Sequence, residues 1–435
     1  MQNKTIVIHP QLKGRNADVG YSRTQESRLE EARGLAHAAD LQVAMSQVVP
    51  IQSITPATYI GKGKVEEIAE YIKENSISLA VINTEITPIQ QRNLEKFWEC
   101  KVIDRTGLIL EIFGQRANSK EGRLQVALAA QEYQRSRLVR SWTHLERQRG
   151  GAGFMGGPGE TQIESDRRAI RDRIALIKKQ LETVIRTRDE HRKSRRAVPY
   201  KVVALVGYTN AGKSTLFNKI TGAEVVAMDK LFATLDPTMR IIKLPSGNKV
   251  ILSDTVGFIS DLPTDLVAAF RATLEEVVGA DIILHVRDIS NPETEEQKSD
   301  VLAVLSVLGL EHKAANDTIE VLNKVDLLRE KGIRDEGIKE EYISPSLNPL
   351  IPSSPKLYVS AVTGEGIDNL LAVIDKEIAR DNIEINVTLN VSEGKTLAWL
   401  YENGTVLSKK QKAETIKLIV SLSEKNLGIF NKMQG

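Results

Sequence analysis

The stretch KVVALVGYTNAGKSTLFNKITG, which begins at Lys201, constrains the fold more than any other part of the chain. A β-rich apolar run leads into Gly207-x-x-x-x-Gly212-Lys213-Ser214, and a helical pattern follows. Glycines at these positions let backbone N–H groups converge on one anion at the start of a helix. The pattern therefore predicts a phosphate-binding loop between a strand and a helix of an α/β fold.

Each part of this loop has an expected contact with a nucleoside triphosphate. Backbone N–H groups from Asn210 to Ser214 should surround the β-phosphate, and Lys213 should reach the β and γ oxygens. The Ser214 hydroxyl should ligate Mg²⁺. The residues expected to bind are Gly207, Tyr208, Thr209, Asn210, Ala211, Gly212, Lys213, Ser214 and Thr215.

A second motif, KVILSDTVGF, ends a strand pattern further along the chain. An acid at a strand end, here Asp254, can hold a Mg²⁺-bound water, and the Gly257 N–H can meet the γ-phosphate. The pattern Asp-x-x-Gly by itself is also typical of a plain β-turn. Its position after the phosphate loop favours nucleotide binding by Asp254, Thr255, Val256 and Gly257.

Two later strand ends predict which base is bound. In TIEVLNKVDLL, Asp326 can accept both the N1 and N2 hydrogens of guanine, a pair that adenine does not offer, while the Lys324 stem can lie along the base. In LYVSAVTGEGI, a backbone N–H could meet guanine O6, although this pattern alone is typical of a turn. The expected base contacts are Asn323, Lys324, Val325 and Asp326, followed by Val359, Ser360 and Ala361.

The segment LFATLDPTMR lies between the phosphate loop and Asp254 and offers two threonines. Thr234 and Thr238 compete as the Mg²⁺ ligand that senses the γ-phosphate, and spacing alone does not decide between them. Either could also be an ordinary threonine of a surface loop. The nucleotide-binding residues expected here are Phe232, Ala233, Thr234, Leu235 and Asp236.

The stretch RGGAGFMGGPGET, from 149 to 161, holds six glycines in thirteen residues. It has neither a preceding strand nor Gly-Lys-Ser, so it does not fit a phosphate loop. Helical patterns flank it from about 120 to 147 and from about 162 to 193. The second carries a heptad-like seam of Ile163, Ile170, Ile174, Ile177, Leu181 and Ile185. An antiparallel hairpin with a glycine-rich tip is therefore predicted.

The second helix of this hairpin is basic, with twelve Lys or Arg against six Asp or Glu between 164 and 196. A solvated helix face would explain that charge, and a flexible linker would explain the glycines. The two features together favour an RNA-binding tip, because glycine lets a backbone approach RNA and arginine meets phosphates. The RNA contacts expected are Gly150, Gly151, Gly153, Gly156, Gly157, Gly159, Arg167, Arg168, Arg171 and Arg173.

The 435 residues suffice for two to four domains, each able to bury its own core. Patterns predict helices over 27–39, 64–75 and 87–98, and strands over 41–49 and 78–82. Four domains are expected: an N-terminal α/β domain (1–118), a helical hairpin (119–197), a P-loop domain whose mostly parallel sheet has helices on both faces (198–380), and a small α+β domain (381–435).

The chain totals bear on compartment and partners. The formal net charge is +2, so affinity for nucleic acid must come from local clusters. A single cysteine, Cys100, excludes an intramolecular disulfide and fits a reducing compartment. The start has no signal-peptide pattern, and the run VLAVLSVLGL is too short to span a bilayer. A cytoplasmic monomer without a membrane anchor is expected.

The motifs together resemble the translation-factor-related P-loop GTPases and, more narrowly, the HflX family. The narrower resemblance lies in YIGKGKVEEI at Tyr59, GPGETQIESDRR at Gly157, FATLDPT at Phe232 and DTVGFI at Asp254. It covers roughly residues 20 to 380 and weakens beyond. One departure stands at the tip, where the family more commonly has an arginine before GPGET and this chain has FMGG.

The resemblance implies a GTPase that exchanges GTP and GDP, binds the large ribosomal subunit and its rRNA, and splits stalled ribosomes with its tip near the peptidyl transferase centre. It makes Thr234 the better Mg²⁺ ligand of the two threonines. Two alternatives stay open: a GTP-regulated RNA-binding factor that is not a productive enzyme, and a factor in ribosome assembly or tRNA modification.

Hydrolysis poses a separate question, because Phe258 follows Gly257 where many signalling GTPases place a water-orienting glutamine. Lys213, Thr234 and Gly257 are the expected γ-phosphate contacts, and the catalytic group is unknown. Related GTPases use an asparagine at the position of Asn210 to bind K⁺, which could act on developing charge. Stimulation by the ribosome is the other route.

Overall fold

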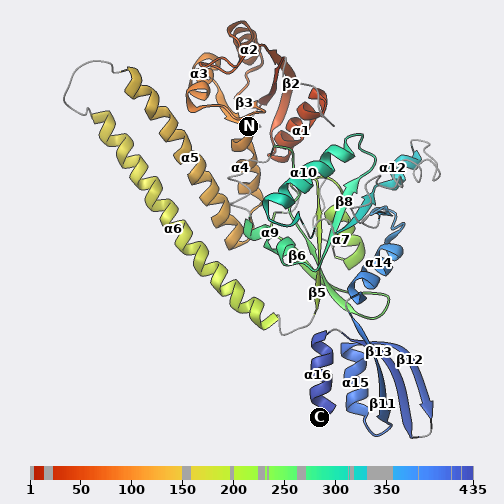
Figure 1. Ribbon diagram of the computed structural model, residues 1–435. Coiled ribbons are helices and arrows are strands. Elements are labelled where there is room, and N and C mark those ends of the chain that lie inside the picture. Colours follow the sequence, from red (N-terminus) through yellow and green to blue (C-terminus); the bar gives the residue numbers. More distant parts are fainter. Residues whose placement is uncertain are drawn as a thin grey trace.

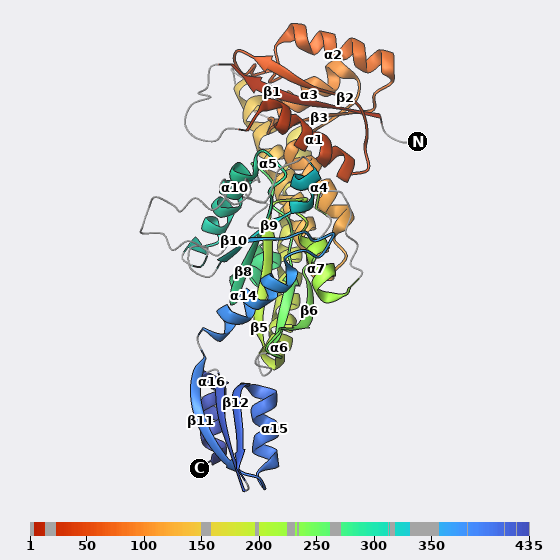
Figure 2. The ribbon, with the colours of Figure 1, turned by 90° about the vertical axis from the view of Figure 1, so that its right-hand side faces the viewer.

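The computed structural model describes residues 4–13, 23–148, 158–195, 200–223, 231–232, 235–261, 271–311, 313, 318–330, 356–380, 382–412, 414–422 and 424–434. An N-terminal sheet, a central sheet and a C-terminal sheet follow one another along the molecule, and two long helices run beside the first two (Figures 1 and 2). The domain boundaries given above stay predictions.

The N-terminal region is a four-stranded parallel sheet in the order β2-β1-β3-β4, flanked by helices. Sequence patterns missed its central strand β1, its short strand β4 and the helix α4. The elements are β1 (Lys4–Leu12), α1 (Gln25–Ala38), β2 (Gln42–Ile51), α2 (Lys62–Asn75), β3 (Leu79–Ile82), α3 (Pro88–Trp98), β4 (Lys101–Asp104) and α4 (Arg105–Arg116).

Helix starts in this region follow their capping residues. Thr87 accepts a hydrogen bond from the Gln90 N–H, and the Gln90 side chain accepts one from the Thr87 N–H, which makes a capping box ahead of Pro88. Asp104 ends β4 and caps α4 through the Gly107 N–H at 2.8 Å. The helix predicted from its Thr-Pro start is therefore confirmed.

Two long helices, α5 (Lys120–Gln148) and α6 (Pro158–Arg195), lie side by side as an antiparallel pair (Figure 1). The middle of the predicted seam is buried, at Ile174, Ile177 and Leu181 of α6, whereas Ile170 and Ile185 are half-buried. The side chain of Ile163 lies outside the described residues. An ion pair of 3.2 Å joins Lys178 of α6 to Glu132 of α5. The tip between the helices, residues 149–157, lies outside the described residues.

The central region is a six-stranded sheet in the order β10-β9-β8-β5-β7-β6, parallel except for β6. Its elements are β5 (Lys201–Gly207), α7 (Lys213–Thr221), β6 (Thr238–Lys243), β7 (Lys249–Asp254), α9 (Arg271–Val278), β8 (Ile282–Asp288), α10 (Thr294–Val307), β9 (Thr318–Asn323), α12 (Val325–Glu330), β10 (Lys356–Tyr358) and α14 (Ile367–Ala379).

Alternate residues of β5 belong to two different cores. Val203 and Leu205 pack with residues of α7 and α14, whereas Ala204 and Val206 pack with residues of α9 and α10. Both faces of the sheet are thus covered by helices, which explains the nearly continuous apolar run of β5. The predicted P-loop fold with helices on both faces is confirmed.

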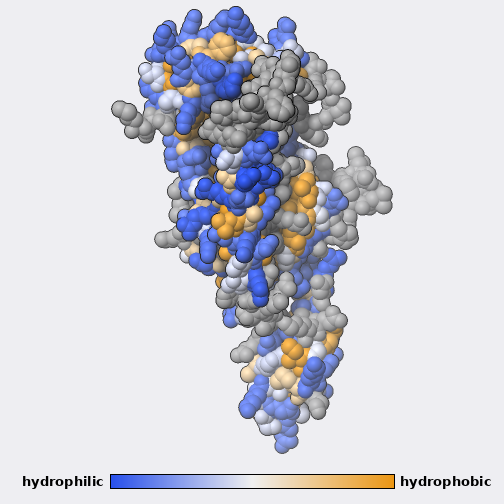
Figure 3. Space-filling model, turned by 90° about the vertical axis from the view of Figure 1, so that its left-hand side faces the viewer, coloured by the Kyte–Doolittle hydropathy of each residue, from blue (hydrophilic) through white to orange (hydrophobic). Residues whose placement is uncertain are grey.

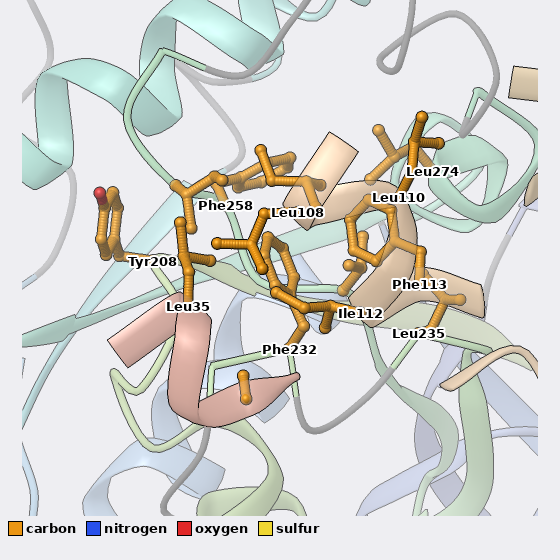
Figure 4. Packing of buried hydrophobic residues seen from close by; sticks show 14 of the residues in the cluster. Leu35, Leu108, Leu110, Ile112, Phe113, Tyr208, Phe232, Leu235, Phe258 and Leu274 are labelled. Carbon is orange, nitrogen blue, oxygen red and sulfur yellow. The ribbon is translucent and has the colours of Figure 1, made fainter. Parts of the chain in front are cut away.

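One hydrophobic cluster crosses the predicted domain boundaries. It joins Leu35 of α1 and Leu108 of α4 to Phe232 and Phe258 of the central region (Figure 4). Val126 of α5 belongs to the same cluster. The rings of Phe113 and Phe232 meet edge to face with 4.7 Å between their centroids. The first three predicted domains therefore share a core, which their sequences did not indicate.

The C-terminal region is an antiparallel sheet in the order β11-β13-β12 with two helices on one side (Figure 1). Its elements are β11 (Ile383–Asn390), α15 (Gly394–Asn403), β12 (Thr405–Lys412), β13 (Thr415–Leu422) and α16 (Glu424–Gln434). A separate core of residues such as Leu400 and Val420 holds it together. Among the described helices of the whole chain, none is long and apolar enough to cross a membrane.

Candidate nucleotide site

The phosphate loop connects β5 to α7 at the carboxyl edge of the central sheet. A Cβ at Gly207 would lie 2.1 Å from the Val286 carbonyl oxygen, and one at Gly212 would lie 2.3 Å from Nδ2 of Asn323. Gly212 also has a φ of 89°, which favours glycine. Glycine is therefore favoured at Gly207 because the backbone of β8 lies too close for a side chain, and at Gly212 because of its φ and the Asn323 side chain beside it.

Lys213 begins α7 and is buried. Its amine donates hydrogen bonds to the carbonyl oxygens of Gly207, at 3.0 Å, and Tyr208, at 2.7 Å. Burial lowers the pKa of Lys213 to about 8, and the nearby Asp254 carboxylate opposes that shift. A bound phosphate would favour the charged form further and could take the place of the two carbonyl acceptors.

Ser214, an expected Mg²⁺ ligand, lies beside Asp254, which is expected to hold a Mg²⁺-bound water. The Ser214 hydroxyl donates a 2.7 Å hydrogen bond to Oδ2 of Asp254, which is the last residue of β7. The described residues contain no cluster of three or more His, Cys, Asp or Glu side chains that could hold a metal by themselves. A hydroxyl and one carboxylate suit Mg²⁺, which usually takes its other ligands from water and phosphates.

The segment after Asp254 folds back onto the phosphate loop. The Thr209 N–H donates to the Phe258 carbonyl at 2.7 Å, and the Phe258 N–H donates to the Gly207 carbonyl at 3.1 Å. A Cβ at Gly257 would lie 2.9 Å from both the Lys213 amine and Thr209 Cα. Gly257 therefore lies directly against the phosphate loop, as its predicted γ-phosphate role requires.

Phe258 itself points away from the nucleotide side. Its ring is buried among Leu35, Leu108 and Phe232 (Figure 4). A glutamine at this position could orient water only if its side chain pointed to the phosphates. The structure thus gives Phe258 a packing role and agrees with the prediction that another group orients the water.

At the base end of the site, Asn323 ties two loops together. Its Nδ2 donates to the Ala211 carbonyl at 2.9 Å, and its Oδ1 accepts from the Ala361 N–H at 3.0 Å. The Ser360 N–H donates to the Glu365 carbonyl at 3.0 Å. The N–H groups expected to meet guanine O6 thus already have acceptors within the protein, so a contact from either would be shared.

Asp326 and Lys324 flank the expected base position. Oδ1 of Asp326 is buried and has no hydrogen-bond partner among the described residues. The Lys324 amine pairs with the Asp288 carboxylate at 2.7 Å, which fixes the direction of its stem. A buried carboxylate oxygen without a partner costs free energy unless a ligand supplies a donor, and the N1 and N2 hydrogens of guanine would do so.

The other predicted nucleotide contacts divide into three groups. Val325, Val359, Val256, Phe232 and Leu235 are buried in the cores around the site. Asp236 accepts hydrogen bonds from the Asn118 and Ser119 N–H groups, and Thr255 donates to the Leu205 carbonyl. Ala233 and Thr234 lie outside the described residues, while Thr238, the competing threonine, opens β6 opposite Asp254.

The four arginines predicted to contact RNA belong to α6, and Figure 3 shows the side of the molecule on which α5 and α6 lie in Figure 1. Arg168, Arg171 and Arg173 of α6 are exposed, and Arg167 is partly buried. Gly159 is within α6, and the other five predicted glycines are outside the described residues.

Sequence reasoning missed a second set of residues at this site. The Tyr208 hydroxyl accepts a 2.7 Å hydrogen bond from the Ser260 N–H and donates to Glu31 of the N-terminal region. Arg23 and Arg105 also contact Glu31. The aromatic residue inside a glycine-rich loop was the available signal, but its partners are too distant in sequence for any pattern to find.

Models of four protein families match the chain in order. They are GTP-binding GTPase N-terminal over residues 26–114, GTP-binding GTPase Middle Region over 116–195, 50S ribosome-binding GTPase over 202–324 and HflX C-terminal domain over 352–433. The expected weakening of the resemblance beyond residue 380 is therefore wrong, because the last match extends through the small C-terminal domain.

Individual proteins match over similar lengths. GTPase HflX of Magnetococcus marinus is 50% identical over 407 residues, 94% of this chain and 90% of that protein. GTPase HflX of Escherichia coli is 42% identical over 374 residues, which are 86% of this chain and 84% of that protein. The crystal structure of the SsGBP and GDP complex has a TM-score of 0.48 at 23% identity, over 86% of this chain and 98% of that one. By its sequence matches, the chain belongs to the HflX family of GTPases.

Proposed function

We propose that the chain binds GTP across the carboxyl edge of the central sheet and hydrolyses it to GDP and phosphate. The observation that carries this proposal is the coincidence of two features at one edge. Gly207, Gly212 and Lys213 form a phosphate loop, and Asp326 presents a buried carboxylate oxygen without a partner among the described residues. The first suits a triphosphate and the second suits guanine.

The side chains have separate roles in this reaction. Lys213 neutralises the β and γ oxygens, and the Gly257 N–H meets the γ-phosphate. Ser214 and Thr234 would hold Mg²⁺, with Asp254 holding a bound water; the ion supplies charge neutralisation between the phosphates when bound. Asp326 orients the base. K⁺ near Asn210 is a further proposed cofactor.

Since Phe258 is buried away from the phosphates, the attacking water needs another orienting group, and intrinsic turnover should be slow. We expect stimulation by the large ribosomal subunit, by K⁺, or by both. Measuring turnover in K⁺ and in Na⁺, each with and without subunits, tests both routes. Fast turnover in Na⁺ without subunits would contradict both.

We also propose that GTP drives a conformational change with which the chain binds the large ribosomal subunit and splits stalled ribosomes. The support is the 50S ribosome-binding GTPase model that covers the central region, together with the long basic hairpin. Arginines on α6 suit rRNA phosphates. A factor acting in ribosome assembly or tRNA modification would instead prefer other particles or substrates.

Two hairpin variants test this proposal. Deleting residues 150–158 should leave intrinsic GTP hydrolysis unchanged and weaken subunit splitting, as followed by light scattering. Neutralising Arg167, Arg168, Arg171 and Arg173 should weaken subunit binding and reduce its salt slope by about one unit for each lost phosphate contact.

Neutralising four exposed basic residues of α2 and α3, which are Lys62, Lys73, Arg92 and Lys96, controls for the loss of four charges. Normal splitting by the deletion variant would contradict the role of the tip. Co-sedimentation with small subunits in place of large ones would favour the alternative function.

A further inference from the structure

A buried polar cluster connects the N-terminal region to the two loops of the nucleotide site. We call it the Glu31 cluster; its members are Arg23, Glu31, Arg105, Tyr208 and Ser260. The side chains of Arg23, Glu31 and Arg105 are 6%, 9% and 8% exposed. Tyr208 comes directly after Gly207 of the phosphate loop, and Ser260 follows the Gly257 turn. The cluster therefore spans the joint between both loops.

Hydrogen bonds satisfy both hydroxyl groups of the cluster. The Tyr208 hydroxyl accepts from the Ser260 N–H and from Arg23, each at 2.7 Å, and donates to Glu31. The Ser260 hydroxyl donates to Glu31 at 2.7 Å and accepts from Arg105 at 3.2 Å. In this arrangement Glu31 only accepts hydrogen bonds, which is consistent with an ionised carboxylate.

The charges support that protonation state. Burial alone would raise the pKa of Glu31, but Arg105 and the two hydroxyls overcome it and lower that pKa. Burial and the Glu31 charge raise the pKa of Tyr208, so its hydroxyl keeps the proton that it donates. One carboxylate thus holds a residue of each nucleotide loop by a charge-assisted hydrogen bond.

The two loops also meet directly, through the hydrogen bond from the Ser260 N–H to the Tyr208 hydroxyl and the bond from Ser214 to Asp254. Between them run the backbone bonds of Phe258 to Gly207 and Thr209, with Gly257 lying against Lys213. Because Glu31 binds both Tyr208 and Ser260, it adds a charged link to these direct bonds and restrains the Gly257 segment against the phosphate loop. We propose that Glu31 of the N-terminal region is a positioning residue for GTP hydrolysis, acting through Tyr208 and Ser260.

This inference depends on GTP hydrolysis by the site but not on ribosome splitting. A carboxylate that positions the γ-phosphate loop should affect turnover and leave GDP binding alone, because GDP lacks the group that Gly257 meets. If Glu31 only stabilises the fold, its substitution should lower the stability of the protein, and kcat and GDP affinity should not change separately. The two roles therefore differ in a measurable way.

The test uses the full chain and three single variants. Tyr208→Phe removes one hydroxyl and keeps the ring that Arg23 covers, whereas Glu31→Gln removes the charge and Ser260→Ala the second hydroxyl. Each should lower kcat about tenfold with the GDP Kd within about twofold, since tenfold corresponds to 1.4 kcal/mol of lost transition-state stabilisation. The variant carrying both Glu31→Gln and Tyr208→Phe should lose no more than the worse single variant.

The control is Asp261→Asn. Asp261 adjoins Ser260 and pairs with Arg28 at 3.1 Å across the same interface, but its side chain is 67% exposed, so kcat should stay unchanged. Equal kcat values in Tyr208→Phe and the wild type would overturn the inference, as would parallel losses of kcat and GDP affinity. A wild-type chain without GTP hydrolysis would instead contradict the proposed function.

Discussion

The N-terminal and central sheets are built alike, but the polar groups at their carboxyl edges are used differently. Both are parallel over most of their strands, and polar residues follow the strand ends in each. At the central edge, Asp326 Oδ1 and Thr209 Oγ1 are buried without hydrogen-bond partners among the described residues. At the N-terminal edge, the polar side chains bind one another and the central region.

The N-terminal edge is filled by the protein itself. Asn83, which follows β3, bonds to the His9 ring at 3.1 Å and accepts from Arg105 at 2.7 Å. Arg105 also donates a 2.8 Å hydrogen bond to the Ser260 carbonyl. Burial lowers the pKa of His9, so the ring stays neutral within this network.

The difference teaches how one architecture serves two purposes. The carboxyl edge of a parallel sheet collects polar groups and usually binds a ligand there. Where those groups satisfy one another, the edge becomes an interface that supports a neighbouring site. Where glycines and unpartnered oxygens remain, it becomes the ligand site. Both halves of this comparison can be tested by single substitutions.

The largest effect should come from Asp326→Asn at the central edge. The amide offers guanine a donor in place of an acceptor, so GTP affinity should fall by about 3 kcal/mol, roughly two orders of magnitude. Affinity for xanthosine nucleotides should rise, because xanthine presents the complementary pattern. Fluorescent nucleotide titration measures both. Asp368→Asn, the same change on the exposed side of α14, should alter neither; tight GTP binding by Asp326→Asn would rule out the base assignment.

Gly257→Ala should have the next largest effect. The added Cβ would lie 2.9 Å from the Lys213 amine and from the Thr209 backbone, so the segment must move away from the phosphates. We expect turnover to fall about 10- to 100-fold, as small misplacements of reacting groups commonly cost. Gly114→Ala, in open space within α4, is the control. Unchanged single-turnover rates would show that Gly257 does not meet the γ-phosphate.

Asn83→Ala tests the opposite edge. Loss of its contacts leaves Arg105 and His9 short of partners, which should lower the free energy of unfolding by about 1 to 3 kcal/mol. The folded variant should bind GDP normally. Asn93→Ala removes an exposed hydrogen bond to the Ala57 carbonyl and should change stability by less than about 0.5 kcal/mol. Denaturant unfolding compares the two, and equal stabilities would mean that the edge network contributes little.

The smallest predicted effect is the uptake of protons when the nucleotide binds. Burial lowers the pKa of Lys213 to about 8, and nucleotide phosphates favour its charged form. Binding of GDP at pH 8 should therefore take up about half a proton, but only about a tenth at pH 7. Affinity should fall as pH rises above 8. Calorimetry in buffers of different ionisation enthalpy measures the uptake; equal values at both pH values would contradict the lowered pKa.

Much of the central edge was predictable because it depends on local chemistry. Gly212, Lys213 and Ser214 belong to one loop whose backbone geometry their own residue types dictate. Strand patterns for the N-terminal region failed at β1, whose His9 and Pro10 interrupt an otherwise apolar run. The seam of α6 was predictable since Ile174, Ile177 and Leu181 recur at helical spacing.

The direction of side chains at the interface was decided only by the tertiary structure. Glu31 and Tyr208 are 177 positions apart, and Arg105 and Ser260 are 155 apart. From the sequence alone, a charged residue on an amphipathic helix, such as Glu31, is expected to face solvent. Phe258 likewise could be seen to lack a polar group, but its burial against Leu35 required the two sheets to be placed together. Sequence determines which groups a loop presents, whereas packing determines which of them remain for a ligand, because burial and long-range partners set the free energy of each polar atom.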